Sequence, residues 1–90
     1  MTSVPRITVR YWAGARAAAG VPEEQVDAST LAEALAVVTA GHGPEFAAVL
    51  GVCSFVVTDQ PVGLADPAAV ALTPGDVVVV LPPFAGGSQA

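Results

Sequence analysis

The chain has 90 residues, 53% of them hydrophobic, and a formal net charge of −5. This length suits one domain with a modest core that folds without disulfides or a metal. The charge argues against nucleic acid, no apolar run approaches the roughly 20 residues of a membrane span, and the N-terminus has no signal-peptide pattern. We therefore expect a cytoplasmic protein that binds neither nucleic acid nor membrane.

The first quarter of the chain contains two predicted strands. Residues 6–12 alternate between apolar and mixed positions, which indicates a strand with one buried face. Residues 14–20 form a helix-like turn or short loop bracketed by glycines, and residues 21–28 form a second, more polar strand at an edge. Glu23 and Glu24 are expected to be solvated on that edge.

A helix follows the second strand. Residues 30–33, Thr-Leu-Ala-Glu, fit a capping box, in which the threonine hydroxyl and the glutamate satisfy free amide groups of the first turn. The helix runs to around residue 40, with Leu31, Leu35 and Val38 facing the core. Residues 45–50 form one further short helical turn.

The second half of the chain is mostly extended. Residues 52–58 predict a third strand, residues 59–61 a turn, and residues 62–64 a brief fourth strand. Residues 73–76, Thr-Pro-Gly-Asp, favour a type II turn, because proline and glycine stand at its two central positions. The last strand is residues 77–81.

This order of elements predicts an α+β domain at residues 1–81, followed by an extended C-terminal tail at residues 82–90. The domain is a mixed sheet of four to five strands with one main helix packed on one face. The last strand is apolar on both faces, so one apolar face is left bare. Two interpretations stay open: scattered exposed valines, or an apolar partner-binding surface made of Val77, Val79, Leu81 and Trp12.

The tail has an unusual sequence, Pro82-Pro83-Phe84-Ala85-Gly86-Gly87. The two prolines cannot continue a sheet interior and favour an extended chain. The two glycines lack a side chain and accept almost any backbone conformation. The pattern is typical of a tail that enters the active site of another protein.

The one cysteine, Cys53, cannot form an internal disulfide, and no histidine or second cysteine stands at metal-ligand spacing. We expect a buried structural thiol and no metal site. His42, near the end of the main helix, is expected to interact with the helix dipole or to be solvated.

Three segments together resemble one family. They are residues 9–16 followed by Gly20 (Val-Arg-Tyr-Trp-Ala-Gly-Ala-Arg, then Gly), residues 74–78 (Pro-Gly-Asp-Val-Val) and residues 81–87 (Leu-Pro-Pro-Phe-Ala-Gly-Gly). The chain looks like a member of the MoaD/ThiS-type sulfur-carrier family, and most like the small subunit of molybdopterin synthase. The resemblance implies a ubiquitin-like β-grasp fold, which the order of elements fits independently.

The resemblance also implies an activity. An E1-like adenylyltransferase/sulfurtransferase would use ATP to adenylate the carboxylate of Gly87, which would then become a thiocarboxylate. The thiocarboxylate would donate sulfur in molybdenum cofactor biosynthesis, in complex with a large, MoaE-like subunit of molybdopterin synthase. The chain would be a non-catalytic carrier that binds no cofactor itself.

The resemblance implies roles for further residues. Trp12 and Leu81 match apolar residues that the family uses against its partners, and Arg16 matches an arginine at the contact with the activating enzyme. The tail residues would lie in the partner's active site: Pro82, Pro83, Phe84, Ala85 and Gly86. The structural alternatives are that Trp12 caps the sheet and that Arg16 is a solvated loop residue.

One departure from the family pattern is important, because Ser88, Gln89 and Ala90 follow the glycine that must carry a free carboxylate. A processing protease would remove them if the chain is a carrier precursor. The alternatives are a ubiquitin-like modifier that joins Gly87 to a target lysine, an interaction module whose tail never reacts, and an artificial addition of three residues. The acceptor also stays open between molybdopterin, thiamine, cysteine and a secondary metabolite, and the Pro-Pro-x-x-Gly-Gly ending favours molybdopterin.

Overall fold

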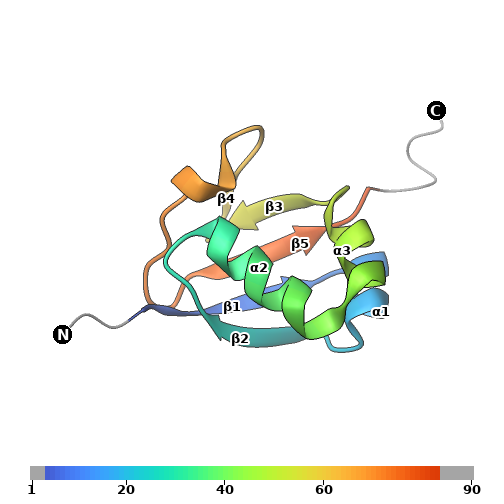
Figure 1. Ribbon diagram of the computed structural model, residues 1–90. Coiled ribbons are helices and arrows are strands. Elements are labelled where there is room, and N and C mark those ends of the chain that lie inside the picture. The colour runs from blue at the N-terminus through green and yellow to red at the C-terminus, as the bar shows by residue number, and fades with distance from the viewer. Residues whose placement is uncertain (1–3, 84–90) are drawn as a thin grey trace.

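The computed structural model describes residues 4–83, which form one mixed sheet with helices packed against it (Figure 1). The strands of the described part are β1 (Arg6–Tyr11), β2 (Glu23–Asp27), β3 (Ser54–Val57), β4 (Gln60–Pro61) and β5 (Val77–Leu81). The helices of that part are α1 (Ala13–Ala19), α2 (Leu31–His42), α3 (Pro44–Leu50) and the short 3-10 helix η1 (Pro67–Ala69). This arrangement confirms the predicted α+β class.

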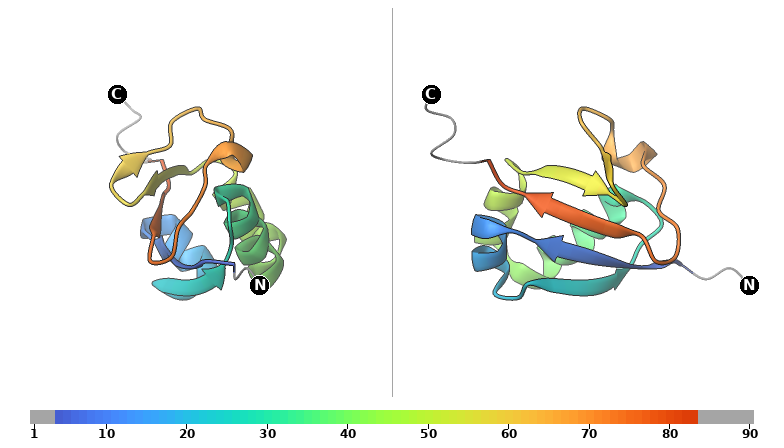
Figure 2. Two further views of the ribbon diagram at one scale, coloured as in Figure 1. Left: turned by 90° about the vertical axis from the view of Figure 1, so that its left-hand side faces the viewer. Right: turned by 180° about the vertical axis from the view of Figure 1, so that it is seen from behind.

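The first and last strands lie side by side at the centre of the sheet. The strand order is β2-β1-β5-β3-β4, and the β1–β5 pair is parallel whereas the other pairs are antiparallel. Tyr11 of β1 is the register partner of Val80 of β5. Because the two strands run in the same direction, the residues that follow them emerge at the same edge of the sheet (Figure 2).

The helices lie on one face of the sheet and leave the other face uncovered, as the view from behind shows (Figure 2). The uncovered face was predicted, but the number of helices was underestimated. Residues 13–19 form a helix because alanine has the highest helix propensity, and Gly20 ends it in the left-handed conformation (φ 80°). Within residues 4–83, none of the helices combines the length and apolar character needed to cross a membrane.

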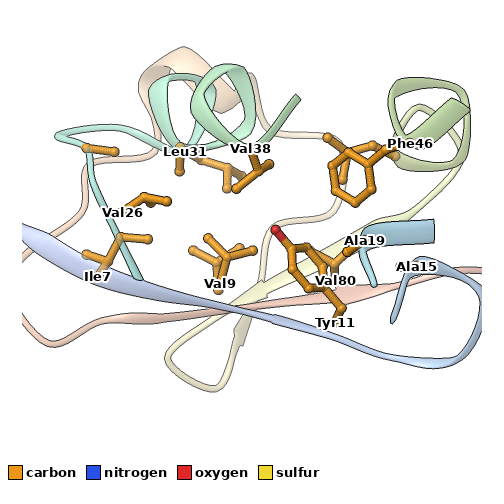
Figure 3. Packing of buried hydrophobic residues seen from close by; sticks show 14 of the residues in the cluster. Ile7, Val9, Tyr11, Ala15, Ala19, Val26, Leu31, Val38, Phe46 and Val80 are labelled. Carbon is orange, nitrogen blue, oxygen red and sulfur yellow. The ribbon is translucent and has the colours of Figure 1, made fainter. Parts of the chain in front are cut away.

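The core lies between the helices and the inner faces of β1 and β5 (Figure 3). Its large fully buried side chains are Ile7, Val9, Leu31, Val38, Phe46, Val78 and Val80. The predicted stripe on α2 is confirmed, with Leu31 and Val38 buried and Leu35 packed partly against the core.

The predicted capping box at the start of α2 is also present. The Thr30 hydroxyl accepts a hydrogen bond from the Glu33 amide N–H (3.2 Å). Glu33 Oε1 accepts from the Ser29 amide N–H (2.8 Å), one residue earlier than the simplest form of the motif.

The predicted fourth strand at residues 62–64 is wrong. Thr58 and Asp59 both have positive φ (44° and 70°) and make a tight turn, so the returning strand begins at Gln60 instead. Gln60 and Pro61 pair with Val57 and Val56 of β3. One further hydrogen bond continues the pairing, from the Val62 amide to the Phe55 carbonyl (3.0 Å), and the chain then leaves the sheet.

The type II turn before β5 is confirmed and is linked to the β3–β4 turn through Asp76. Gly75 has φ 88°, and the Asp76 amide donates to the Thr73 carbonyl (3.1 Å). Asp76 Oδ2 accepts from the Thr73 amide (2.8 Å), and Oδ1 accepts from the Thr58 hydroxyl (2.7 Å). These hydrogen bonds lower the pKa of Asp76 below its usual value, and the bond from the Thr73 amide has the largest effect.

Glu24 is not on a solvated edge, in contrast to the prediction. Its neighbours along β2, Glu23 and Gln25, are exposed, whereas Glu24 points to the opposite face of the strand. The Glu24 carboxylate accepts a hydrogen bond from the Tyr11 hydroxyl and contacts His42 Nε2. Tyr11 is only 3% exposed and packs edge-on against Phe46. The pKa of Tyr11 is raised far above its ordinary value. Burial is the largest cause, followed by the hydrogen bond to Glu24 and the negative charge of Glu24.

Asp76→Asn should lower the free energy of unfolding by about 1 kcal/mol at neutral pH, because the neutral amide loses one acceptor oxygen and the charge. The lowered pKa means that the carboxylate stabilises the fold above the unfolded pKa of about 3.9, and that this stability is lost as pH falls further. Urea unfolding at several pH values measures both effects. Asp59→Asn, in the adjacent turn, is the control, and equal losses in both variants would contradict the assignment.

Tyr11 is the one tyrosine of the chain, so its ionisation can be followed by near-ultraviolet absorbance. The raised pKa means that the neutral phenol stabilises the fold below the unfolded pKa of about 10, and that this stability is lost as pH rises further. We expect phenolate to form only together with alkaline unfolding. In the Glu24→Gln variant, phenolate should form at lower pH, whereas the control Glu23→Gln should behave like the parent protein. If Tyr11 of the folded parent protein ionised near the ordinary pKa of tyrosine, the contact with Glu24 would be disproved.

Candidate functional site

The uncovered face of the sheet is apolar along β5. Val77, Val79 and Leu81 are half-buried on this face, whereas Val78 and Val80 point into the core and are 0% exposed. The structure therefore places the three predicted residues of the last strand together on the side of the sheet that no helix covers (Figure 2).

Trp12 extends this apolar surface at the edge where β5 ends. It follows β1 directly, and its amide donates to the Val80 carbonyl (3.2 Å), which holds it next to β5. Trp12 is 55% exposed, so much of the residue is accessible at this edge. Continuing the β1–β5 register by one residue puts Trp12 opposite Leu81.

Val56 belongs to the same surface, although the sequence reasoning did not single it out. It is the register partner of Val79 and lies on the same face of β3. The sequence of β3, Ser-Phe-Val-Val, does not alternate, so only the pairing of β3 with β5 shows the face and the neighbour of Val56. We call this surface the apolar band; its members are Trp12, Val56, Val77, Val79 and Leu81.

A charged row borders the apolar band on β1 and β2. Arg6 pairs with Asp27 (3.2 Å) and Arg10 with Glu23 (3.1 Å). These pairs are exposed, so each contributes less than about 1 kcal/mol to stability. Their main effect is to place charge of both signs beside the apolar band, which sequence alone could not show because it depends on the β1–β2 register.

Arg16 lies close to Trp12 and belongs to the helix α1, where a helix-like turn or short loop was expected. Both line an open hollow of about 290 Å³ beside β1, together with Arg10 and Glu23. Among residues 4–83, no carboxylate lies within ion-pair distance of Arg16. Its charge is therefore available to a partner at the edge where the tail leaves the sheet.

The described chain ends just after the sheet. Pro82 is half-buried and Pro83 is exposed. The remaining predicted tail residues, Phe84, Ala85, Gly86 and Gly87, lie outside the described residues, as do Ser88, Gln89 and Ala90. The structure thus gives the point of exit of the tail, beside Trp12.

Cys53 lies directly before β3 and is half-buried, a little less than expected. Its thiol donates to the Val49 carbonyl (3.1 Å), and burial raises the pKa of the thiol above its ordinary value. A protonated, hydrogen-bonded thiol is a poor nucleophile, which agrees with a structural role. Across the described range, histidine, cysteine and carboxylate side chains do not gather in groups of three or more that could hold a metal.

Solved structures with this fold are similar over almost the whole chain. The small archaeal modifier protein 1 from Methanosarcina acetivorans has 21% identity and a TM-score of 0.80, covering 92% of this chain and 97% of that one. The Haloferax volcanii HVO 2177 protein has 28% identity and a TM-score of 0.73, covering 92% and 87%.

Subunit 1 of the molybdopterin-converting factor from Helicobacter pylori, solved in complex with subunit 2, also matches. It has 26% identity and a TM-score of 0.68, covering 91% of this chain and 99% of that one. These likenesses confirm the predicted β-grasp fold.

The curated protein sequences contain no match. A family model described as the ThiS family matches residues 9–87, a range that includes the apolar band and extends through Gly87. Since this match spans far more than half of the chain, the protein belongs to the ThiS family.

Proposed function

We propose that this protein is a sulfur carrier, in which Gly87 becomes the reactive end after removal of Ser88, Gln89 and Ala90. The observation that carries the proposal is the apolar band, which lies on the uncovered face of the sheet and leads directly into the tail. The family match supports it further, because it continues to the glycine that would react.

The proposed reaction needs little from the chain itself. A carboxylate is a poor electrophile, so the activating partner would transfer adenylate from ATP to the Gly87 carboxylate and release pyrophosphate. Sulfide would then attack the acyl carbon, and AMP would leave, which yields the thiocarboxylate. Acid, base and nucleotide site would belong to the partner, and the carrier would contribute positioning.

The apolar band provides that positioning. A partner that packs on Val79 and Leu81 would hold the end of β5, and six residues, Pro82 to Gly87, can span at most roughly 20 Å beyond it. The prolines reduce the conformational entropy that docking would remove. The glycines allow the backbone to enter a channel too narrow for side chains.

The proposed partners are an E1-like adenylyltransferase/sulfurtransferase, a large MoaE-like subunit and a processing protease. Molybdopterin is the proposed sulfur acceptor, supported by the Pro-Pro-Phe-Ala-Gly-Gly ending and by the Helicobacter pylori neighbour, which is itself part of a two-subunit complex. Thiamine, cysteine or a secondary metabolite is the alternative acceptor.

A ubiquitin-like modifier is the second candidate, because an activated glycine can acylate a lysine amine as well as sulfide. The likeness to the archaeal modifier supports the fold alone. The chain has no lysine, so its copies could not be joined to one another through side chains.

The intact mass of the protein from its native host tests the proposal. We expect loss of the last three residues and an oxygen-to-sulfur exchange at the new terminus, and Gly87→Ala should fold normally but not load sulfur, because a Cβ obstructs the channel. Conjugates to other proteins would favour the modifier. An unprocessed terminus that ATP and the activating enzyme leave unchanged would contradict both candidates.

Val79→Arg should weaken binding to the activating enzyme by at least tenfold, because it places a charge at the centre of the apolar band. The free energy of unfolding should fall by only about 1 kcal/mol, since Val79 is half-buried on the face that no helix covers. Val37→Arg is the matched control, because Val37 is an exposed valine on α2. Titration calorimetry and urea unfolding give the two quantities, and equal binding by both variants would exclude this face as the docking surface.

A further inference from the structure

A second hollow lies at the other end of β5 from the tail. It has a volume of about 360 Å³, in the lower part of the range of about 300–1,000 Å³ that ligand pockets occupy. Its lining residues are mainly apolar and come from β3, β4, the following loop and the residues before β5. They include Val57, Pro61, Val62, Ala65, Val70 and Asp76.

The wall of this hollow includes a strained turn. Thr58 is β-branched yet has φ 44°, which such residues rarely adopt. It is held there by three contacts: its hydroxyl donates to Asp76, its hydroxyl accepts from the Val77 amide (3.2 Å), and its amide donates to the Val77 carbonyl (2.9 Å). Positive φ at Thr58 and Asp59 is the geometry of a two-residue hairpin turn between β3 and β4, and the three contacts fix the shape of this wall of the hollow.

The surroundings of the hollow carry negative charge. Arg16 is the last lysine or arginine of the sequence, so every formally charged side chain from there to the end is acidic. Asp76 lines the hollow, Asp59 is in the turn at its wall, and Asp66 precedes η1. Because both oxygens of Asp76 already accept internal hydrogen bonds, Asp59 is the more accessible of the two turn carboxylates.

An exposed leucine accompanies the hollow. Leu64 is 106% exposed at the loop between β4 and η1, and the lining residues Val62 and Ala65 lie two residues before it and one residue after it. The loop projects beyond the sheet (Figure 1). A partner that binds here would make two apolar contacts, one with the exposed Leu64 side chain and one with the lining of the hollow.

We propose that this hollow docks a protein segment that presents an apolar side chain flanked by arginine or lysine. The apolar side chain would enter the hollow and contact Leu64, and the flanking cations would face Asp59 and Asp66. The commitment to a basic segment rests on charge complementarity with Asp59, Asp66 and Asp76. Arg6 lies nearby, since its carbonyl accepts from the Gly75 amide, but its guanidinium is paired with Asp27.

The place of the hollow suggests why a carrier would use it. It adjoins the start of β5, whereas the tail leaves from the other end of the strand, roughly 16 Å away for five residues of about 3.3 Å each. A protein bound at the hollow would leave the tail free to engage a second one. The proposal does not depend on sulfur chemistry at Gly87.

Amide chemical shifts of the full chain, measured during titration with three short peptides, test the proposal. The first peptide has a Leu-Leu core between arginines, the second the same core between glutamates, and the third a Ser-Ser core between arginines. We expect saturable shifts at residues 57–65 and 70–77 with the first peptide and at least tenfold weaker binding of the other two.

Variants locate the site. Ala65→Leu should fill the hollow and weaken binding of the first peptide roughly tenfold, whereas Ala36→Leu, at an exposed position on α2, should not. Asp59→Asn should weaken binding of the first peptide about two- to fivefold, and Glu45→Gln on α3 should have no effect.

Three outcomes of the titrations would overturn the proposal: equal binding of all peptides, shifts centred on the apolar band, or no binding. Dimerisation abolished by Leu64→Ser would also overturn it, since the occupant would be a second copy.

Discussion

The parallel pairing of β1 and β5 organises both the core and the outer face of the sheet. These strands come from the two ends of the domain, and together they form the centre of the sheet. Their inner faces supply much of the core, and their shared direction brings Trp12 and Leu81 to one edge. Without this pairing the apolar band would be divided, and the tail would not leave beside it.

The second constraint is the position of the helices. α1, α2 and α3 cover one face of the sheet, yet β5 is apolar on both faces (Figure 2). Burying Val78 and Val80 stabilises the fold, whereas Val77, Val79 and Leu81 remain half-exposed. Stability and partner binding thus use alternate residues of one strand, which is why a change at Val79 separates binding from folding.

Two polar contacts show how short-range patterns can mislead about the environment of a residue. Glu24 and Glu23 are adjacent in a polar strand, but they point to opposite faces, so one contacts Tyr11 and His42 and the other pairs with Arg10. Asp76 was recognised as part of a turn, and the structure shows that it also joins that turn to Thr58. Both contacts join residues far apart in the sequence.

The elements that could be predicted from the sequence are those whose causes are local. Alternation in β1, the capping box at Thr30 and the Pro-Gly turn before β5 each depend on neighbouring residues, and each is present. The bare apolar face also followed from the sequence, since an all-apolar last strand can be covered on one side only. Tertiary structure alone decided which residues meet across strands: Val56 beside Val79, and Trp12 opposite Leu81. The reason is that strand register is set by packing and by turn geometry across the whole sheet, and no window of sequence contains that information.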